Sequence, residues 1–243
     1  MTQLPRISAS KLTTFRDCRT NYAAKYLQRL KPRRETTYSI LGSATHSGIE
    51  AGYKDEFPYT AFDNVVQKRF AEIEHMPTMG YTPAQVQDMG YKFLDDFDYS
   101  LFTPRAMEQE FSIEHVTQQF STVLLGGFID FIGTVKDMSG EGVIDFKTNK
   151  KPYTKNEIYN NWQLAIYTQA YWVMYGKPPA FAAIYHIPSA TMQCADITQL
   201  VYLFEKTIDP TIDELIEFSA TFDIDTQLTK CKNCSIFCAL KWD

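Results

Sequence analysis

The chain has 243 residues, of which 44% are hydrophobic and 14% aromatic, and its formal net charge is −5 at pH 7. This length suits one large domain with a sizeable core, and the composition excludes a disordered chain. No apolar run approaches the roughly 18 residues of a membrane helix. The first residues lack the apolar segment of a signal peptide, so we expect a cytoplasmic protein that does not enter a membrane. The negative charge argues against binding by broad attraction to phosphates, although basic residues cluster at 29–34 and 147–155.

The N-terminal segment predicts two short helices. Ser8 or Ser10 can cap the first, whose apolar positions include Leu12, and the second extends from about residue 19 to residue 30. Cys18 falls between them. A lone cysteine is most often a small buried hydrophobic residue.

A third helix carries a histidine. Pro32 ends the preceding pattern, and helical periodicity resumes with Gly42 near its start and His46 one turn later. A lone histidine is more often a structural residue than a ligand, so this pattern alone leaves both roles open. Motif-free helical stretches follow, and we expect a helical lobe over residues 55–100.

Two central strands place acidic and basic groups together. Residues 123–135 are rich in β-branched and aromatic side chains, residues 137–142 supply a turn, and residues 143–147 resume the strand pattern. Side chains alternate along a strand, so Asp145 and Lys147 share one face, while Ile144 and Phe146 share the other.

Asp130 stands alone among apolar neighbours on the first of these strands, where an unpaired carboxylate is costly to bury. A cation should therefore lie near it. A hairpin centred near Ser139 leaves Asp130 a few residues out of register with Asp145, so we expect a bent strand to bring both to one ion.

The flanking segments predict a mixed sheet with helices on its faces, an α/β fold. A strand at 111–116 follows Glu110, a candidate outer carboxylate, and a helix at 160–175 places Gln163 and Tyr167 four residues apart on one face. Strands at 180–187 and 192–197 and a helix at 199–220 complete the pattern. We expect the remaining histidines to be structural: His75, His115 and His186.

The C-terminal tail carries a cysteine cluster. Cys231, Cys234 and Cys238 lie within eight residues. This spacing indicates metal ligation, and thiolates select zinc or iron–sulfur clusters, which normally take four ligands. The spacing alone leaves Cys18 and Cys194 as candidates for the fourth.

Four ordered motifs together resemble the RecB-like branch of the PD-(D/E)XK nucleases. They are Gly-x-x-x-His at 42–46, Gly-x-x-Asp at 127–130, Asp-x-Lys at 145–147 and Gln-x-x-x-Tyr at 163–167. The opening segment from Ser8 to Leu27 is also similar to the family's first segment. The resemblance implies one restriction-endonuclease-like domain over residues 1–243, with its catalytic core at 105–200.

The resemblance also implies roles for these residues. Asp130 and Asp145 would bind Mg²⁺ or Mn²⁺, with the Phe146 backbone carbonyl and His46 completing the metal site. Lys147 would position the attacking water or offset charge on the phosphate. Gln163 and Tyr167 would orient DNA or the catalytic motifs.

A metal cluster joining the chain ends is a further implication. RecB-like nucleases such as the small CRISPR-associated exonucleases and the AddAB-type nucleases take one cysteine from the N-terminal segment and three from the tail. Cys18, Cys231, Cys234 and Cys238 match this arrangement, which implies a 4Fe–4S cluster formed by residues 1–30 and 225–243. The last two cysteines are closer together than is usual in these families, and a structural Zn²⁺ on the same four thiolates is the alternative.

The expected function is that of a metal-dependent DNA exonuclease acting on single strands or DNA ends, in recombination, repair or phage DNA metabolism. The alternative is a non-catalytic DNA-end-binding or scaffold subunit of a CRISPR adaptation or helicase–nuclease complex. The chain has no phosphate-binding Gly-x-x-x-x-Gly-Lys-Ser/Thr motif, so any helicase motor would be a separate protein.

Overall fold

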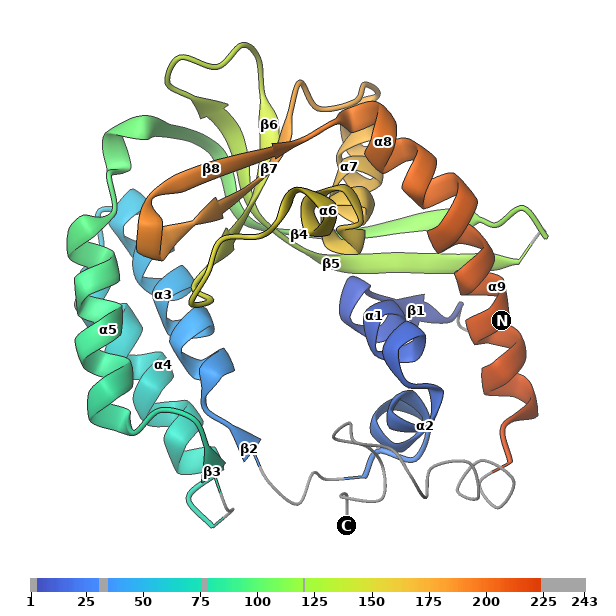
Figure 1. The fold of residues 1–243 in the computed structure, drawn as a ribbon, viewed down its shortest axis with the longest axis horizontal. Helices are drawn as coiled ribbons and strands as arrows, with labels where there is room; N and C mark the ends of the chain where they lie inside the picture. Colours follow the sequence, from blue (N-terminus) through green and yellow to red (C-terminus); the bar gives the residue numbers. More distant parts are fainter. Residues whose placement is uncertain (1–3, 31–34, 76–77, 120, 224–243) are drawn as a thin grey trace.

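The computed structural model describes residues 4–30, 35–75, 78–119 and 121–223 and shows a mixed six-stranded sheet flanked by helices (Figure 1). The predicted α/β class is therefore correct. The strand order is β1 (Arg6–Ile7), β5 (Thr122–Val135), β6 (Gly142–Lys147), β7 (Ala182–His186) and β8 (Thr191–Ala195), and β4 (Phe102–Val116) also pairs with β5. Among the described residues, no helix is long and apolar enough to cross a membrane.

Apart from a short helix at Lys155–Tyr159 that was not expected, the helices lie close to where the periodicity predicts them, with two interruptions. Their bounds are α1 (Ala9–Asp17), α2 (Arg19–Tyr22), α3 (Tyr38–Tyr53), α4 (Pro58–Glu72), α5 (Pro83–Asp96), α6 (Lys155–Tyr159), α7 (Trp162–Tyr175), α8 (Ile197–Leu203) and α9 (Asp209–Thr221). A π-helical turn at Ala23–Leu27 follows α2, and another at Phe204–Ile208 divides the long C-terminal helix expected at 199–220. Pro210 explains the second interruption, because it has no N–H group and its ring crowds the carbonyl four residues earlier.

The two edges of β5 are occupied differently. β4 pairs antiparallel with β5 over its whole length, from Phe102 opposite Val135 to Val116 opposite Thr122. The opposite edge is therefore shared: β1 takes its N-terminal part and β6 its C-terminal part. Residues 126–130 lie between these two partners, and within the described ranges that stretch of the edge pairs with no strand. Asp130 lies at the end of this opening.

The register of the central hairpin differs from the expected one. Phe131 lies opposite Ile144, and Gly133 lies opposite Gly142, so the turn is centred between Asp137 and Met138 rather than near Ser139. The pairing ends at Phe131 and Ile144, so Asp130 and Asp145 each lie one residue beyond the last pair rather than a few residues out of register. The predicted offset is therefore wrong. The turn is shifted because Asp137 adopts a left-handed conformation with φ 64°, as Asp tolerates better than most residues.

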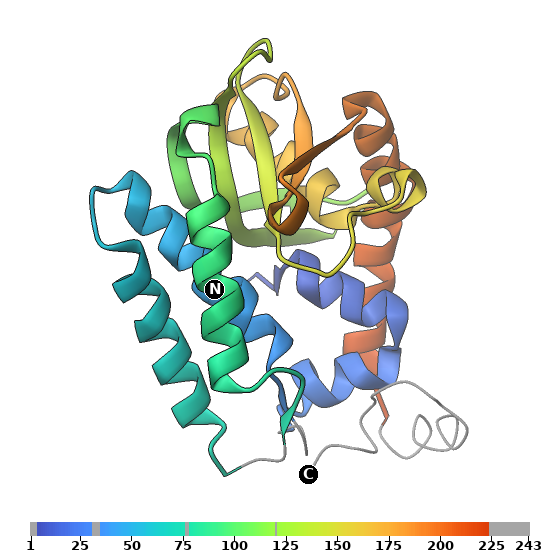
Figure 2. The same cartoon turned by 60° about the vertical axis from the view of Figure 1, so that its left-hand side comes forward.

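Both faces of β6 are covered. Ile144 and Phe146 pack into a core formed with α3, α4 and α5, the helical lobe seen on the left of Figure 1 and in front in Figure 2. Val143, on the same face as Asp145, belongs to a second core with α1, α7, α8 and α9. Asp145 and Lys147 of β6 therefore lie at the margin of an apolar core rather than on a solvent-exposed face of the sheet.

Candidate active site

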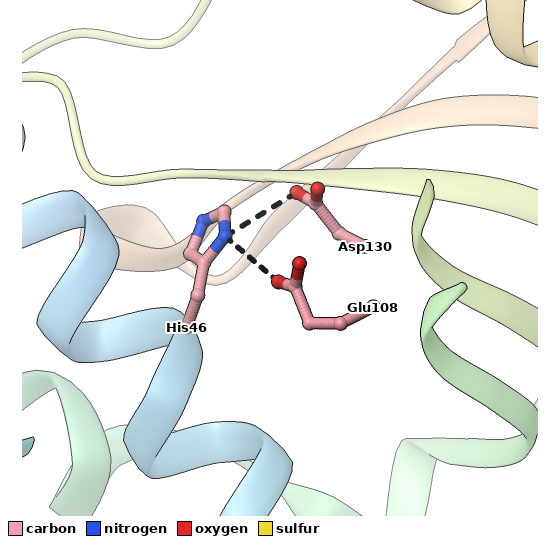
Figure 3. Close-up of side chains that lie close together, drawn as sticks. All are labelled: His46, Glu108 and Asp130. Atoms are coloured by element: carbon pink, nitrogen blue, oxygen red, sulfur yellow. Dashed lines mark ion pairs between the residues drawn. The ribbon is translucent and has the colours of Figure 1, made fainter. Parts of the chain in front are cut away.

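Helix α3 directs His46 at the end of the central strands. The His46 Nε2 atom lies 2.9 Å from the backbone carbonyl oxygen of Phe146, which can only accept a hydrogen bond, so Nε2 carries the proton. The other ring nitrogen, Nδ1, is 3.5 Å from a Glu108 carboxylate oxygen and 3.6 Å from an Asp130 carboxylate oxygen (Figure 3). The carbonyl therefore orients the imidazole toward two acids.

Glu108 reaches the site through an irregularity in β4. Met107 pairs with Phe131 and Gln109 with Ile129, but Glu108 between them adopts φ 46°. This positive φ is costly for a residue with a side chain, and such strain concentrates at functional sites. His46, Glu108 and Asp130 each offer a ligand atom, and these atoms lie within 4.8 Å of one another.

The two aspartates are buried. Asp130 is 5% exposed and accepts a hydrogen bond from the Phe146 N–H at 2.8 Å, while Asp145 has no exposed surface. An Asp145 oxygen lies 2.5 Å from the Lys147 ammonium, but neither Asp145 oxygen has a partner with hydrogen-bond geometry among the described residues. The Asp145 oxygen that Lys147 does not contact, together with the Asp130 carboxylate and the His46 imidazole, fits a divalent cation such as Mg²⁺ or Mn²⁺.

The clustered charges shift several pKa values. Burial lowers the pKa of His46, but Asp130 and Glu108 outweigh it and raise that pKa to about 9. Burial raises the pKa of Asp145, opposed by the Lys147 ammonium and reinforced by Asp130. Burial also disfavours the charged form of Lys147, yet Asp145 and Asp130 raise its pKa. Lys147 is therefore a cation at neutral pH.

Helix α7 holds Lys147 in place. The Lys147 ammonium donates to the Gln163 side-chain carbonyl at 3.1 Å, and the Gln163 amide donates to the Tyr167 hydroxyl at 2.7 Å. Tyr167 is 4% exposed, and burial raises its pKa well above the usual range, so its hydroxyl is neutral. This chain of hydrogen bonds fixes the ammonium relative to Asp145.

Cavities open on two sides of these residues. One, of about 670 Å³, is bordered by His46, Phe146 and Lys147 on the α3 side. The other, of about 880 Å³, is bordered by Asp130, Gln163 and Tyr167 and by α1. The site is therefore accessible from both directions.

Comparison with known families identifies the protein family to which the chain with this site belongs. The profile of the PD-(D/E)XK nuclease superfamily matches residues 6–238, nearly the whole chain. The chain belongs to the PD-(D/E)XK nuclease superfamily. No curated protein matches it. Nucleases of this superfamily use divalent metal ions, DNA is the substrate that such a domain implies, and this chain has a His–Glu–Asp group able to hold such an ion.

The nuclease site contains one residue that sequence reasoning missed. Glu108 joins His46 and Asp130, whereas Glu110, the expected outer carboxylate, pairs with Arg6 at 3.0 Å. Both glutamates point to the same face in a regular strand. No sequence pattern predicts the positive φ at Glu108, which gives the two glutamate side chains different partners.

The other histidines and the two cysteines within the described residues are not part of the ligand group. His115 bonds to Asp209, His186 bonds to the Asn149 carbonyl, and His75 is exposed. Cys18 lies between α1 and α2 and borders the cavity that contains Asp130, while Cys194 is exposed on β8. Cys231, Cys234 and Cys238 lie outside the described residues.

Proposed function

We propose that the protein is an Mg²⁺- or Mn²⁺-dependent DNA exonuclease of the RecB-like branch. It acts on single strands or DNA ends in recombination, repair or phage DNA metabolism, alongside recombination, helicase or CRISPR adaptation proteins. The observation that carries this proposal is the convergence of His46, Glu108 and Asp130 at the opening between β1 and β6 on the edge of β5, beside the Asp145–Lys147 ion pair.

Each residue has a defined task. Asp130, Asp145, Glu108 and His46 would hold the cation, and the Phe146 carbonyl lies beside them. A divalent cation bound there would lower the pKa of a water molecule and offset charge on the scissile phosphate. The Lys147 ammonium lies beside Asp145 and would stabilise the negative charge that grows on the phosphate. Gln163 and Tyr167 would orient Lys147.

A cluster joining the chain ends belongs to the same proposal. We take Cys18 with Cys231, Cys234 and Cys238 as ligands of a 4Fe–4S cluster, with Zn²⁺ as the alternative. The packing of α9 on the helices next to Cys18 supports this choice, since Phe218 contacts Phe15 at a ring-centroid distance of 5.4 Å and Arg19 pairs with Glu214 at 2.6 Å. Helix α9 thus packs against residues on both sides of Cys18 in the sequence.

The proposal is tested with end-labelled single- and double-stranded DNA in Mn²⁺ or Mg²⁺. Asp130→Asn, Asp145→Asn and Lys147→Met should each lower turnover by roughly 10²-fold or more, as loss of a transition-state charge contact does. Glu108→Gln should weaken metal activation. Circular single-stranded DNA should resist the wild-type enzyme if digestion requires an end.

Matched exposed positions provide the controls. Asp88→Asn on α5, Lys68→Met on α4 and Glu114→Gln on β4 remove the same groups outside the site and should leave turnover unchanged. Near-wild-type, EDTA-sensitive cleavage by two of the three variants of Asp130, Asp145 and Lys147 would show that the catalytic site lies elsewhere. DNA binding by the wild type without any cleavage would favour an end-binding subunit.

A further inference from the structure

The cavity on the α3 side has features that phosphate hydrolysis does not require. Its walls are the first turns of α3, Tyr81 and the segment Thr148–Lys150 after β6, and it ends at His46, Phe146 and Lys147. Tyr38, Gly42 and His46 recur every four residues along α3. Tyr38 and His46 are thus about 12 Å apart along the helix axis. Gly42 adds no side chain between them, and a Cβ atom there would lie 3.4 Å from the Thr148 hydroxyl oxygen.

An exposed aromatic residue forms one wall of this cavity. The Tyr38 side chain is 52% exposed, and its ring meets Tyr81 edge to face, with centroids 5.0 Å apart and an interplanar angle of 88°. A large aromatic ring exposed at a cavity mouth leaves apolar surface in contact with water. A flat binding partner could cover that surface. Tyr81 thus supports a Tyr38 residue that remains about half exposed.

The chain holds this aromatic pair in position. Buried Thr37 donates its backbone N–H to the Met79 carbonyl at 2.9 Å and its hydroxyl to the Tyr81 carbonyl at 2.8 Å, next to the pairing of β2 (Glu35–Thr36) with β3 (Thr78–Met79). Gly80 links Met79 to Tyr81 in the chain and adopts φ 120°. A Cβ atom there would lie 2.6 Å from the Thr37 hydroxyl oxygen. The Thr37 hydrogen bonds therefore hold the Tyr38 and Tyr81 rings in position.

The opposite wall is basic and also fixed. The buried His186 ring donates from Nε2 to the Asn149 carbonyl at 2.6 Å and accepts at Nδ1 from the Ser189 hydroxyl at 2.7 Å. This anchors the segment that presents exposed Lys150 to the cavity. An aromatic platform facing a cationic wall is the combination that binds single-stranded nucleic acid.

We propose that this cavity is a nucleobase-binding subsite in which an unpaired base stacks on Tyr38, beside the phosphate held near Lys147. The inference rests on the proposed function, because the metal-site residues place the phosphate. A base can present its face to Tyr38 only when it has left its own stack, so the subsite selects unpaired strands. Lys150 would contact the adjoining backbone phosphate.

Binding measured in EDTA tests the subsite without reference to cleavage. Wild-type protein is titrated into labelled six-nucleotide oligothymidylate and into a six-unit abasic oligomer with the same backbone. The wild type should bind oligothymidylate more tightly. Tyr38→Ala should weaken that binding roughly 5- to 100-fold, the loss expected for one base stack, and leave abasic affinity unchanged. Tyr38→Phe should bind like the wild type.

Tyr202→Ala provides the matched control. Tyr202 is 58% exposed on α8, which packs with the other core, so its removal should change neither affinity. Thermal unfolding of each variant verifies the fold. Equal weakening of both oligomers by Tyr38→Ala, or a wild-type protein that does not distinguish them, would overturn the inference. Failure of the nuclease proposal is seen separately, as base-dependent binding without cleavage in Mn²⁺.

Discussion

The ionisation of His46 depends on burial and on two neighbouring acids. The Asp130 and Glu108 carboxylates raise its pKa from the ordinary 6.5 to about 9. A group whose pKa is raised by folding stabilises the folded state fully below its unfolded pKa, and that stabilisation is lost as pH rises through the folded pKa. In EDTA, the His46 contribution is therefore complete below pH 6.5 and declines toward pH 9.

The prediction is that the wild type in EDTA loses more thermal stability between pH 6.5 and 9.5 than His46→Gln does. Only neutral imidazole binds a metal ion, so Mn²⁺ binding near pH 7.5 should also release close to one proton from the wild type and fewer from the variant. Thermal unfolding and calorimetry in buffers of different ionisation heat measure these effects. His75→Gln, at an exposed position, is the control. Parallel stability profiles for wild type and His46→Gln would contradict the assignment.

At the same scale, Asp130, Asp145 and Lys147 could be predicted from the sequence because each stands out chemically. An acid among apolar neighbours and an acid–lysine pair on one strand face are visible without coordinates. Glu108 could not be predicted. Its position depends on one left-handed residue in β4, and a positive φ at glutamate has no sequence signature.

At the scale of elements, α7 packs against β6 and also orients the Lys147 side chain through the hydrogen bond that Gln163 accepts. Gln163 accepts from Lys147 and donates to Tyr167, which is buried, so we expect Gln163 to act by orienting the ammonium. Gln163→Leu should remove the orienting contact while preserving the half-buried helix face. We predict a roughly tenfold lower kcat, about the effect of one lost hydrogen bond to a charged group, with little change in KM.

Steady-state cleavage of single-stranded DNA separates these two parameters. Gln169→Leu is the matched control, because Gln169 is also half-buried on α7 but is not part of the Lys147 chain. A Gln163→Leu variant with normal kcat and raised KM would assign Gln163 to substrate binding instead.

Element positions were more predictable than their pairing. Periodicity located α3, α7, β5 and β6, since 3.6- and 2-residue repeats depend only on local burial. The register of β5 with β6 depended on the left-handed Asp137, and β1 could not be anticipated, because two residues leave no periodic pattern. Yet β1 matters for the site: it shares an edge of β5 with β6 and bounds the opening beside Asp130.

At the scale of the whole molecule, the two ends of the described chain meet. Phe15 and Tyr22 from the first helices contact Phe218 on α9, and the Tyr22 and Ser219 hydroxyls lie 3.2 Å apart. Such long-range contact follows from burying apolar faces that are far apart in sequence. Cys18 lies between Phe15 and Tyr22 in the sequence, and its Sγ atom accepts from the Asn21 N–H at 3.4 Å. Cys194 lies instead on β8, at the edge of the sheet.

The last prediction concerns the cluster proposed at this junction. Anaerobically purified protein should be brown and carry about four irons per chain. Cys18→Ser should bleach the protein and lower its thermal stability, because the cluster would tie both ends of the chain together. It should also lower DNA cleavage, because Cys18 borders the cavity that contains Asp130.

Cys194→Ser is the matched control and should keep iron, colour and stability. Iron analysis, visible absorbance and thermal unfolding of the two variants decide the matter together. If the protein is colourless and carries stoichiometric zinc that is lost in Cys18→Ser, the metal is the alternative Zn²⁺ and the four proposed cysteine ligands are unchanged. Loss of metal from Cys194→Ser would instead move the fourth ligand to β8, away from the helices on which α9 packs.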